Sequence, residues 1–319
     1  MQLGSSFLIL SLLFSDGDAK MKILVVGGSG RVGGSAVRSL FRRYGETVSL
    51  SVAGRNAENW MSYKRRKGPI PADFIDLDSK CVSEKLDEVV RRFDLIINTA
   101  GPFQQSLDPL LLRVAMSHGK KYIDVCDDIK LSRVCRGPDL QSLAARTGGT
   151  AIISTGIWPG ASSLLSQELI QRCGGIDMIE ESSYSFFTAG SGGAGPTILT
   201  ATFLIIGENV LVYRNGKETY FKSATDTKEV DFGKGIGVRE VSRLNLIECE
   251  SGYISGLKTI DTYFGTAPKV WNDLFRCMAN LIPQKILQDS KTMSRLADIS
   301  LPLVRLVDKL VGAKNGSRT

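Results

Sequence analysis

The chain has 319 residues, of which 43% are hydrophobic and 23% are charged, and this balance excludes an intrinsically disordered protein. Its length exceeds what one hydrophobic core usually serves, so we expect two domains. The formal net charge of +7 at pH 7 would attract a polyanionic cofactor and carboxylate substrates. No apolar stretch reaches about eighteen residues, so no transmembrane segment is expected.

Residues 1–21 are expected to form an extension that precedes the folded protein. They include a short apolar run, FLILSLLF over residues 7–14, which resembles the core of a signal peptide. No Lys or Arg precedes this run, and Asp16 and Asp18 follow it, which suits neither a secretory signal nor an Arg-rich transit peptide. Secretion is therefore not favoured, and a targeting role for the extension stays open as the alternative.

The next stretch, KILVVGGSGRVGG over residues 22–34, is an apolar strand followed by the spacing G-x-G-x-x-G. Glycines at this spacing let a strand turn tightly into a helix, let bare backbone approach a pyrophosphate and let the helix pack closely on the strand. The N–H groups and the positive dipole end at the helix start would hold the anion. A purely structural glycine turn is the alternative. The predicted dinucleotide site comprises Gly28, Ser29, Gly30, Arg31, Val32 and Gly33.

Short β-branched runs alternate with amphipathic stretches from residue 22 to residue 155, which predicts a parallel sheet covered by helices on both faces. The fold class is thus α/β, a doubly wound Rossmann sheet over residues 22–155, followed by an α+β domain over residues 156–319. The strands are expected at residues 23–26, 47–53, 72–75, 95–98, 122–125 and 151–154.

The second predicted strand ends in AGRN, where Arg55 stands roughly where an NAD-selective site places a carboxylate. A guanidinium at this position would attract a 2′-phosphate, so NADP is preferred over NAD, and Asn56 follows at the same edge. A surface arginine without a ligand is the alternative. The third strand ends at Asp76, which could approach the adenine or cap a helix that begins near Ser79.

The fourth predicted strand closes with NTAGPF, in which Ala100, Gly101 and Pro102 are small or lack a bulky side chain. Ligands of such folds bind at the carboxyl edge of the sheet, so these residues would permit close approach of the ribose and nicotinamide. The alternative is that Gly101 and Pro102 only form a turn.

The fifth predicted strand, KYIDVCDD, brings Asp124, Asp127 and Asp128 to the same edge. Three carboxylates within five residues repel one another, so the pKa of at least one could be raised to suit proton transfer. The alternative is that Asp127 or Asp128 caps a turn. Cys126 is interpreted as a small buried hydrophobe.

The second half begins with GIWPG, in which Trp158 could line the nicotinamide pocket or plug the domain junction. The glycine-rich run over residues 189–196 precedes a predicted helix over residues 197–206 and is a candidate loop for a substrate carboxylate, or else a flexible connection. Residues 253–265 predict strands of an antiparallel sheet. Residues 293–311 predict a helix interrupted by Pro302.

Charged and sulfur-containing residues elsewhere do not indicate another class of site. The basic run KRRK over residues 64–67 has no interleaved aromatic residues, so a solvated helix face is favoured and no nucleic-acid partner is expected. The six cysteines form no CxxC pair, and the chain has a single histidine, so neither a metal site nor a disulfide framework is expected. A reducing compartment is favoured.

The ordered motifs GGSGRVGG, VAGRN, NTAGPF, YIDVCDD, GIWPG and TAGSGGAGPT resemble the saccharopine dehydrogenase-like NADP-binding oxidoreductases, especially their plant and algal branch. The resemblance runs from about residue 22 to about residue 311. It implies a Rossmann domain and an α+β second domain that closes over the nicotinamide. The expected location is the cytoplasm or the plastid stroma. The resemblance further implies that the pyrophosphate is held by Gly28, Gly30, Arg31 and Val32, the 2′-phosphate by Arg55, and the inner ribose by residues 100–102.

In characterised relatives the resemblance also implies hydride transfer at the C–N bond of an amino acid or imine, and the protein could form a homodimer. Family members usually continue beyond the point where this chain stops, so the expectation is either an abbreviated second domain or an incomplete sequence. The leading hypothesis is an NADP(H)-dependent oxidoreductase in which Asp124, Asp127 or Asp128 moves a proton. The alternative is a non-catalytic module that binds or senses NADP(H).

Overall fold

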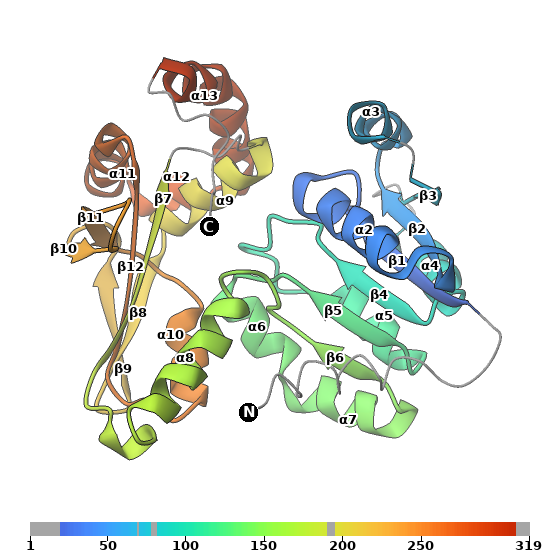
Figure 1. Cartoon of the computed structure of the whole chain (residues 1–319), viewed down its shortest axis with the longest axis horizontal. Coiled ribbons are helices and arrows are strands. Elements are labelled where there is room, and N and C mark those ends of the chain that lie inside the picture. Colours follow the sequence, from blue (N-terminus) through green and yellow to red (C-terminus); the bar gives the residue numbers. More distant parts are fainter. Residues whose placement is uncertain (1–19, 69, 78–81, 190–194, 311–319) are drawn as a thin grey trace. The chain divides into compact units, whose positions relative to one another are not determined.

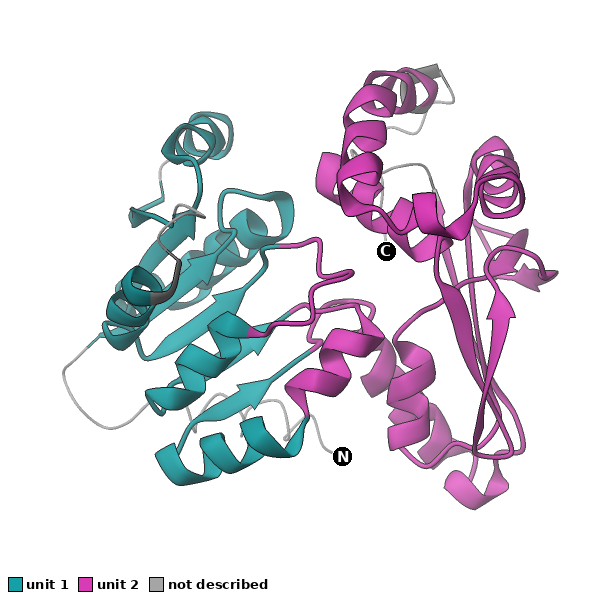
Figure 2. Cartoon of the chain, turned by 180° about the vertical axis from the view of Figure 1, so that it is seen from behind, with its two compact units in different colours: residues 1–100, 110–124, 137–153 teal, residues 101–109, 125–136, 154–319 magenta. Residues whose placement is uncertain are grey.

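The computed structural model describes residues 20–68, 70–77, 82–189 and 195–310 (Figure 1). The chain divides into two compact units, coloured separately in Figure 2. The first unit comprises Met1–Ala100, Leu110–Asp124 and Gly137–Ile153, and the second comprises Gly101–Pro109, Val125–Arg136 and Ser154–Thr319. Two short segments of the expected first domain thus pack within the second unit, and the expected boundary at residue 155 stays a prediction.

The first unit contains a six-stranded parallel sheet with the strand order β3-β2-β1-β4-β5-β6. This order is the doubly wound Rossmann arrangement, so the predicted fold class is confirmed for this unit. All six predicted strands are present with shifts of one or two residues at their ends. The strands are β1 (Met21–Val26), β2 (Val48–Gly54), β3 (Ala72–Asp76), β4 (Leu95–Asn98), β5 (Lys121–Asp124) and β6 (Thr150–Ile152).

Both faces of this sheet are buried because side chains of the central strand alternate between two apolar layers. Ile23 and Val25 pack in one cluster with Val37 and Trp60, whereas the fully buried Leu24 points to the opposite face. The basic run forms the last turn of α3, as a solvated helix face predicts. The helices of this unit are α2 (Arg31–Tyr44), α3 (Ala57–Lys67), α4 (Val82–Arg91), α5 (Leu110–Ser117) and α7 (Pro138–Thr147), with a 3-10 turn at Gly45–Thr47.

The second unit is built on a mixed sheet in which β12 is the central strand. It pairs antiparallel with β11 and β8 on one side and parallel with β7 on the other. The second domain is therefore α+β, as predicted. The strands are β7 (Ser182–Ala189), β8 (Asn209–Arg214), β9 (Lys217–Lys222), β10 (Thr227–Asp231), β11 (Val238–Arg243) and β12 (Ile260–Ala267).

Two sequence predictions in this unit are wrong in part. Tyr253 does not begin a strand but lies in a helix, α10 (Glu248–Ile254). Carboxylates in the first turn of this helix interact favourably with the positive end of its dipole, and Gly252 is buried. Pro302 does not interrupt the last helix, α13 (Ser290–Leu310), which continues through it. The exposed proline is tolerated because Met293, Ala297, Leu301 and Val304 bury one continuous face of the helix.

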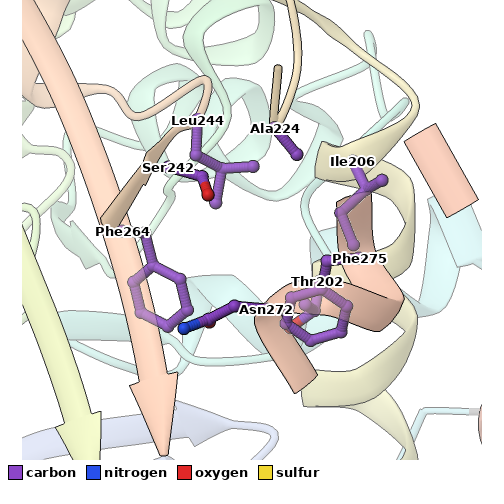
Figure 3. Close-up of a pocket in the computed structure, with 8 residues that line it drawn as sticks. All are labelled: Thr202, Ile206, Ala224, Ser242, Leu244, Phe264, Asn272 and Phe275. Atoms are coloured by element: carbon purple, nitrogen blue, oxygen red, sulfur yellow. The ribbon is translucent and has the colours of Figure 1, made fainter. Parts of the chain in front are cut away.

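Helices and the sheet of the second unit enclose an apolar core, which includes the face of α13 and residues of α9. Within this core a small cavity of about 20 Å³ lies between β11, β12, α9 and α11 (Figure 3). Among the described residues, no helix combines the length and the apolar character needed to cross a bilayer. The helices are α6 (Ile129–Cys135), α8 (Ala161–Arg172), α9 (Pro196–Ile206), α10, α11 (Lys269–Leu281), α12 (Gln284–Leu287) and α13, with a 3-10 turn at Ile176–Met178.

Candidate cofactor site

The turn between β1 and α2 is held by backbone hydrogen bonds and needs glycine at its first position. The Gly27 N–H donates to the Ala53 carbonyl at 2.8 Å, and the Gly30 N–H donates to the Gly27 carbonyl at 2.9 Å. Gly27 has φ +79°, a conformation that L side chains rarely adopt. The tight turn that we expected of Gly28 is therefore made by Gly27. A Cβ on Gly28 would instead lie 2.8 Å from the Val52 side chain.

The third glycine of the fingerprint lets α2 approach the sheet. A Cβ on Gly33 would overlap both the Gly27 carbonyl oxygen and the Thr99 hydroxyl. Thr99 is itself fixed to the end of β1, since its N–H and its hydroxyl both donate to the Val26 carbonyl, at 2.9 and 2.8 Å. The space beside the turn therefore has no room for a side chain at Gly33.

The start of α2 is open to an anion. Gly30 caps the helix without a side-chain hydrogen bond, and the first turn carries no acidic residue. The N–H groups at the start of a helix have no carbonyl partner within it. Arg31 and Val32 are exposed, so this end of the helix is accessible. A glycine cradle next to an uncapped helix start fits a dinucleotide pyrophosphate.

The ends of β2 and β3 lie beside this cradle. A Cβ on Gly54 would be 3.7 Å from the Ser29 hydroxyl oxygen, and Gly54 is the register partner of Asp76. Arg55 follows immediately and is exposed. The Asn56 side chain caps α3, because its Oδ1 accepts from the Glu58 N–H at 2.8 Å. The alternative in which Asp76 caps a helix near Ser79 falls on residues outside those described.

The end of β4 brings the next predicted residues to the same edge of the sheet. Asn98 Oδ1 accepts from the Ala100 N–H at 3.1 Å, and its Nδ2 donates to the Tyr122 hydroxyl at 3.1 Å. Ala100 is exposed. Gly101 and Pro102, joined by a cis peptide bond, belong to the second unit, where a Cβ on Gly101 would lie 3.7 Å from the Thr197 methyl carbon.

The three predicted catalytic carboxylates have different environments. Asp124 ends β5 as the register partner of Asn98 and is 2% exposed. In the second unit, Asp127 accepts from Gln104 Nε2 at 2.9 Å, and burial raises its pKa to about 6 although this hydrogen bond opposes the shift.

Asp128 caps α6, accepting from the Leu131 N–H at 2.7 Å, as the alternative interpretation predicted. Burial raises its pKa despite this bond.

Two further carboxylates lie within electrostatic range of these residues, and the sequence analysis missed both. The half-buried Glu208 is in range of Asp127 and Asp128, and the buried Glu248 is in range of Asp127. Burial raises the pKa of Glu208 to about 7, against the hydrogen bond from Asn245, and the charges of Asp128 and Asp127 add to the shift. Burial also raises the pKa of Glu248, which accepts from the Ser162 hydroxyl at 2.9 Å. One signal could have found Glu208, because it is the single carboxylate in the apolar stretch over residues 197–213.

The remaining predicted features of the second half are only partly described. Trp158 packs on the rings of Phe186 and Phe264, with centroids 5.0 and 5.7 Å away, so it joins an aromatic cluster on the sheet. Residues 190–194 of the glycine-rich run lie outside the described residues. The helix that follows the run is confirmed as α9, with Gly195 as its N-cap.

Comparison with known families agrees with the geometry of the first unit. Residues 23–152 match the family model described as "Saccharopine dehydrogenase NADP binding domain". The resemblance stated from the motifs is therefore confirmed over this segment, and the chain contains an NADP-binding Rossmann domain. No curated protein shows significant sequence similarity to the chain.

Solved structures with similarity to the chain are distant. The WlbA dehydrogenase from Chromobacterium violaceum, in complex with NADH and UDP-GlcNAcA, is 12% identical with a TM-score of 0.42, over 79% of this chain and 69% of that chain. The oxidoreductase yvaA from Bacillus subtilis is 12% identical with a TM-score of 0.37, over 79% and 65%. The PbgP3 protein from Burkholderia pseudomallei is 12% identical with a TM-score of 0.27, and the match spans 33% of this chain and only 38% of that chain.

Proposed function

We propose that the chain is an NADP(H)-dependent oxidoreductase that transfers a hydride at the C–N centre of an amino acid or imine. The observation that carries the proposal is the glycine cradle at the uncapped start of α2, in a segment that matches an NADP-binding domain. The substrate class rests on the motif resemblance over the rest of the chain.

The residues of the first unit would each have a separate task in binding. Gly28, Ser29, Gly30, Arg31, Val32 and Gly33 would surround the pyrophosphate, with backbone N–H groups as donors. Arg55 would pair with the 2′-phosphate as a planar multiple donor, beside Asn56. Asp76 would face the adenine, and Ala100, Gly101 and Pro102 would leave room for the inner ribose.

When bound, the nicotinamide would supply or accept the hydride, and the chain's own residues would move the proton. A general acid or base works best when its pKa is close to the working pH. Asp127, with a pKa of about 6, fits this role best. Asp128 is engaged as a helix cap and Asp124 is deeply buried, so we assign both to positioning the neighbouring backbone. An Asp127→Asn variant that remains active would contradict this division of roles and return Asp124 and Asp128 as the candidates for proton transfer.

Cofactor binding is tested by titrating the full chain with NADPH and with NADH and recording nicotinamide fluorescence. Arg55→Asp should lower NADPH affinity about 10- to 100-fold, because it removes a charge-assisted hydrogen bond and adds repulsion, whereas NADH affinity should change little. Arg65→Asp, an exposed change on α3, is the matched control. Equal losses for both cofactors would refute the role of Arg55.

Catalysis is tested by steady-state oxidation of NADPH with pairs of keto acids and amines. Turnover that Asp127→Asn abolishes, with NADPH affinity unchanged, supports the oxidoreductase. Tight NADPH binding without turnover for any pair would instead favour a module that senses NADP(H).

We also propose a homodimer, a division at residue 155 and a reducing location such as the cytoplasm or plastid stroma. The dimer is supported by α8, which exposes Leu164, Leu165 and Leu169. The location is supported by the described cysteines, which form no disulfide. Light scattering on the full chain should give the mass of a dimer, and Leu165→Glu should halve this mass. Limited proteolysis of the full chain should cut near residue 155. A monomeric wild type or a protected junction contradicts these proposals.

A further inference from the structure

The second unit contains a cavity of about 490 Å³ that the proposed function does not use. It lies at the end of α9, where this helix turns into β8, is bordered by the end of β9 and by the segment that joins α11 to α12, and opens to solvent. None of its lining residues is among those predicted to hold the cofactor or to move a proton. Its volume lies in the range of small-molecule sites.

The wall of this cavity carries one buried polar group without a partner, Ser223, and several exposed amides. Ser223 is 1% exposed, and its hydroxyl oxygen has no hydrogen-bond partner. An unsatisfied buried hydroxyl is costly, so a ligand or water that reaches it would be favoured. Around it lie three amides, of which Gln284 donates to Asn209 at a long 3.3 Å and Asn280 accepts from Lys222 at 3.0 Å.

Two opposite charges line the same cavity without pairing. Glu208 accepts from Asn245 Nδ2 at 2.6 Å, which occupies one of its oxygens. Lys222 is the register partner of Asn209, the residue next to Glu208, so the two charged residues are close along the sheet. Yet among the described residues no cation lies within 4.0 Å of the Glu208 carboxylate, and no carboxylate lies within 4.0 Å of the Lys222 ammonium.

An unpaired carboxylate and an unpaired ammonium in one cavity are complementary to a molecule that carries both charges. We propose that this cavity binds a small zwitterion, with the ligand's ammonium at Glu208 and its carboxylate at Lys222. The exposed amides of Asn209 and Gln284 supply the remaining hydrogen bonds. The apolar side chains of Ile206, Ala279, Leu281, Ile282, Pro283 and Leu287 limit the ligand to a short aliphatic body.

Binding at this cavity goes beyond the proposed function and requires neither cofactor nor turnover. Besides burial, the charges of Asp128 and Asp127 raise the pKa of Glu208, and the nearby ammonium of Lys130 partly opposes them. A ligand ammonium at Glu208 would therefore offset part of the repulsion among these three carboxylates.

The test is isothermal titration of the full chain, without cofactor, with unbranched ω-amino acids from glycine to the six-carbon member. Each is compared with the amine and the carboxylate of the same length, which carry one charge only. At least one zwitterion should bind about tenfold more tightly than both of its single-charge analogues. Equal affinities within every length, or no binding of any member at millimolar concentration, would overturn the proposal.

Variants assign the site within the molecule. Glu208→Gln should remove the advantage of the zwitterion over the carboxylate analogue, and Lys222→Met should remove its advantage over the amine. Exposed residues outside the cavity provide the controls Glu229→Gln and Lys217→Met, which should bind as wild type does. Circular dichroism on each variant shows that the chain is folded, and NADPH fluorescence quenching measured separately distinguishes a failure here from a failure of the proposed function. Unchanged zwitterion binding in Glu208→Gln and Lys222→Met contradicts the assignment.

Discussion

Replacing Gly33 by alanine tests the glycine cradle directly. The added methyl would overlap the Gly27 carbonyl oxygen and the Thr99 hydroxyl. The carbonyl cannot move freely, because it accepts the Gly30 N–H at 2.9 Å and so closes the turn. Relief therefore requires the start of α2 to move away from the sheet, which would misalign the N–H groups that face the pyrophosphate.

The size of the effect follows from the cost of one extra methyl in a closely packed position. Overpacking of this kind costs about 1–3 kcal/mol, so the free energy of unfolding should fall by about that amount. NADPH affinity should fall about 10- to 100-fold, equivalent to about 1.4–2.8 kcal/mol. Ser35→Ala, an exposed change on the same helix, should alter neither quantity.

Urea unfolding followed by tryptophan fluorescence measures the stability, and NADPH fluorescence measures the binding. The double variant Gly33→Ala with Thr99→Ala removes one of the two overlaps and should recover only part of both losses, because the Gly27 carbonyl remains. A Gly33→Ala protein with wild-type stability and wild-type NADPH affinity would refute the argument that this glycine is required for close packing.

Two further predictions concern the second unit. Burial raises the pKa of Asp127 to about 6, so the folded protein binds this proton more tightly than the unfolded chain, and the ionised carboxyl destabilises the fold increasingly as the pH rises from about 4 to 6. The stability of Asp127→Asn relative to wild type should therefore increase between pH 4 and pH 7, by about 1–3 kcal/mol in urea unfolding. A stability difference that does not change with pH would contradict this. Arg133→Met should cost about 1–3 kcal/mol in thermal unfolding, because Arg133 donates to both oxygens of the 5% exposed Glu250, which keeps Arg136 as its remaining cation. Arg172→Met, which breaks an exposed pair with Glu168, should cost less than about 0.5 kcal/mol, and similar losses for both would refute the distinction.

The sequence was most informative where the structure depends on local patterns. The strands of the first unit are predictable because each is a short β-branched run bounded by turn residues, and both faces of the sheet are buried. The glycine spacing located the cradle but not the residue with positive φ. Two consecutive glycines made Gly27 and Gly28 equivalent in the sequence, and only the contacts with Val52 and Ala53 distinguish them.

The second unit was less predictable because its elements depend on contacts between distant residues. Pro302 is compatible with a continuous helix only because α13 packs on α9, about a hundred residues earlier in the chain. Likewise, Tyr253 lies in a stretch whose composition suits a strand, and it is helical because α10 packs on β12 and β8. Neither packing partner could be identified from the local sequence.

The carboxylates of the second unit show how this limit affects the candidate chemistry. The sequence grouped Asp124, Asp127 and Asp128 because they are neighbours in the chain. The structure instead places Asp127 within electrostatic range of Glu208 and Glu248, which come from distant segments, and Asp128 within range of Glu208. Charges that repel one another in a buried environment can titrate as a group, so the pKa of Glu208 depends on Asp127 and Asp128, which no motif connects to it. The pKa of Glu208 should therefore fall in Asp127→Asn, and an NMR titration of the Glu208 carboxyl that shows no change would contradict this coupling.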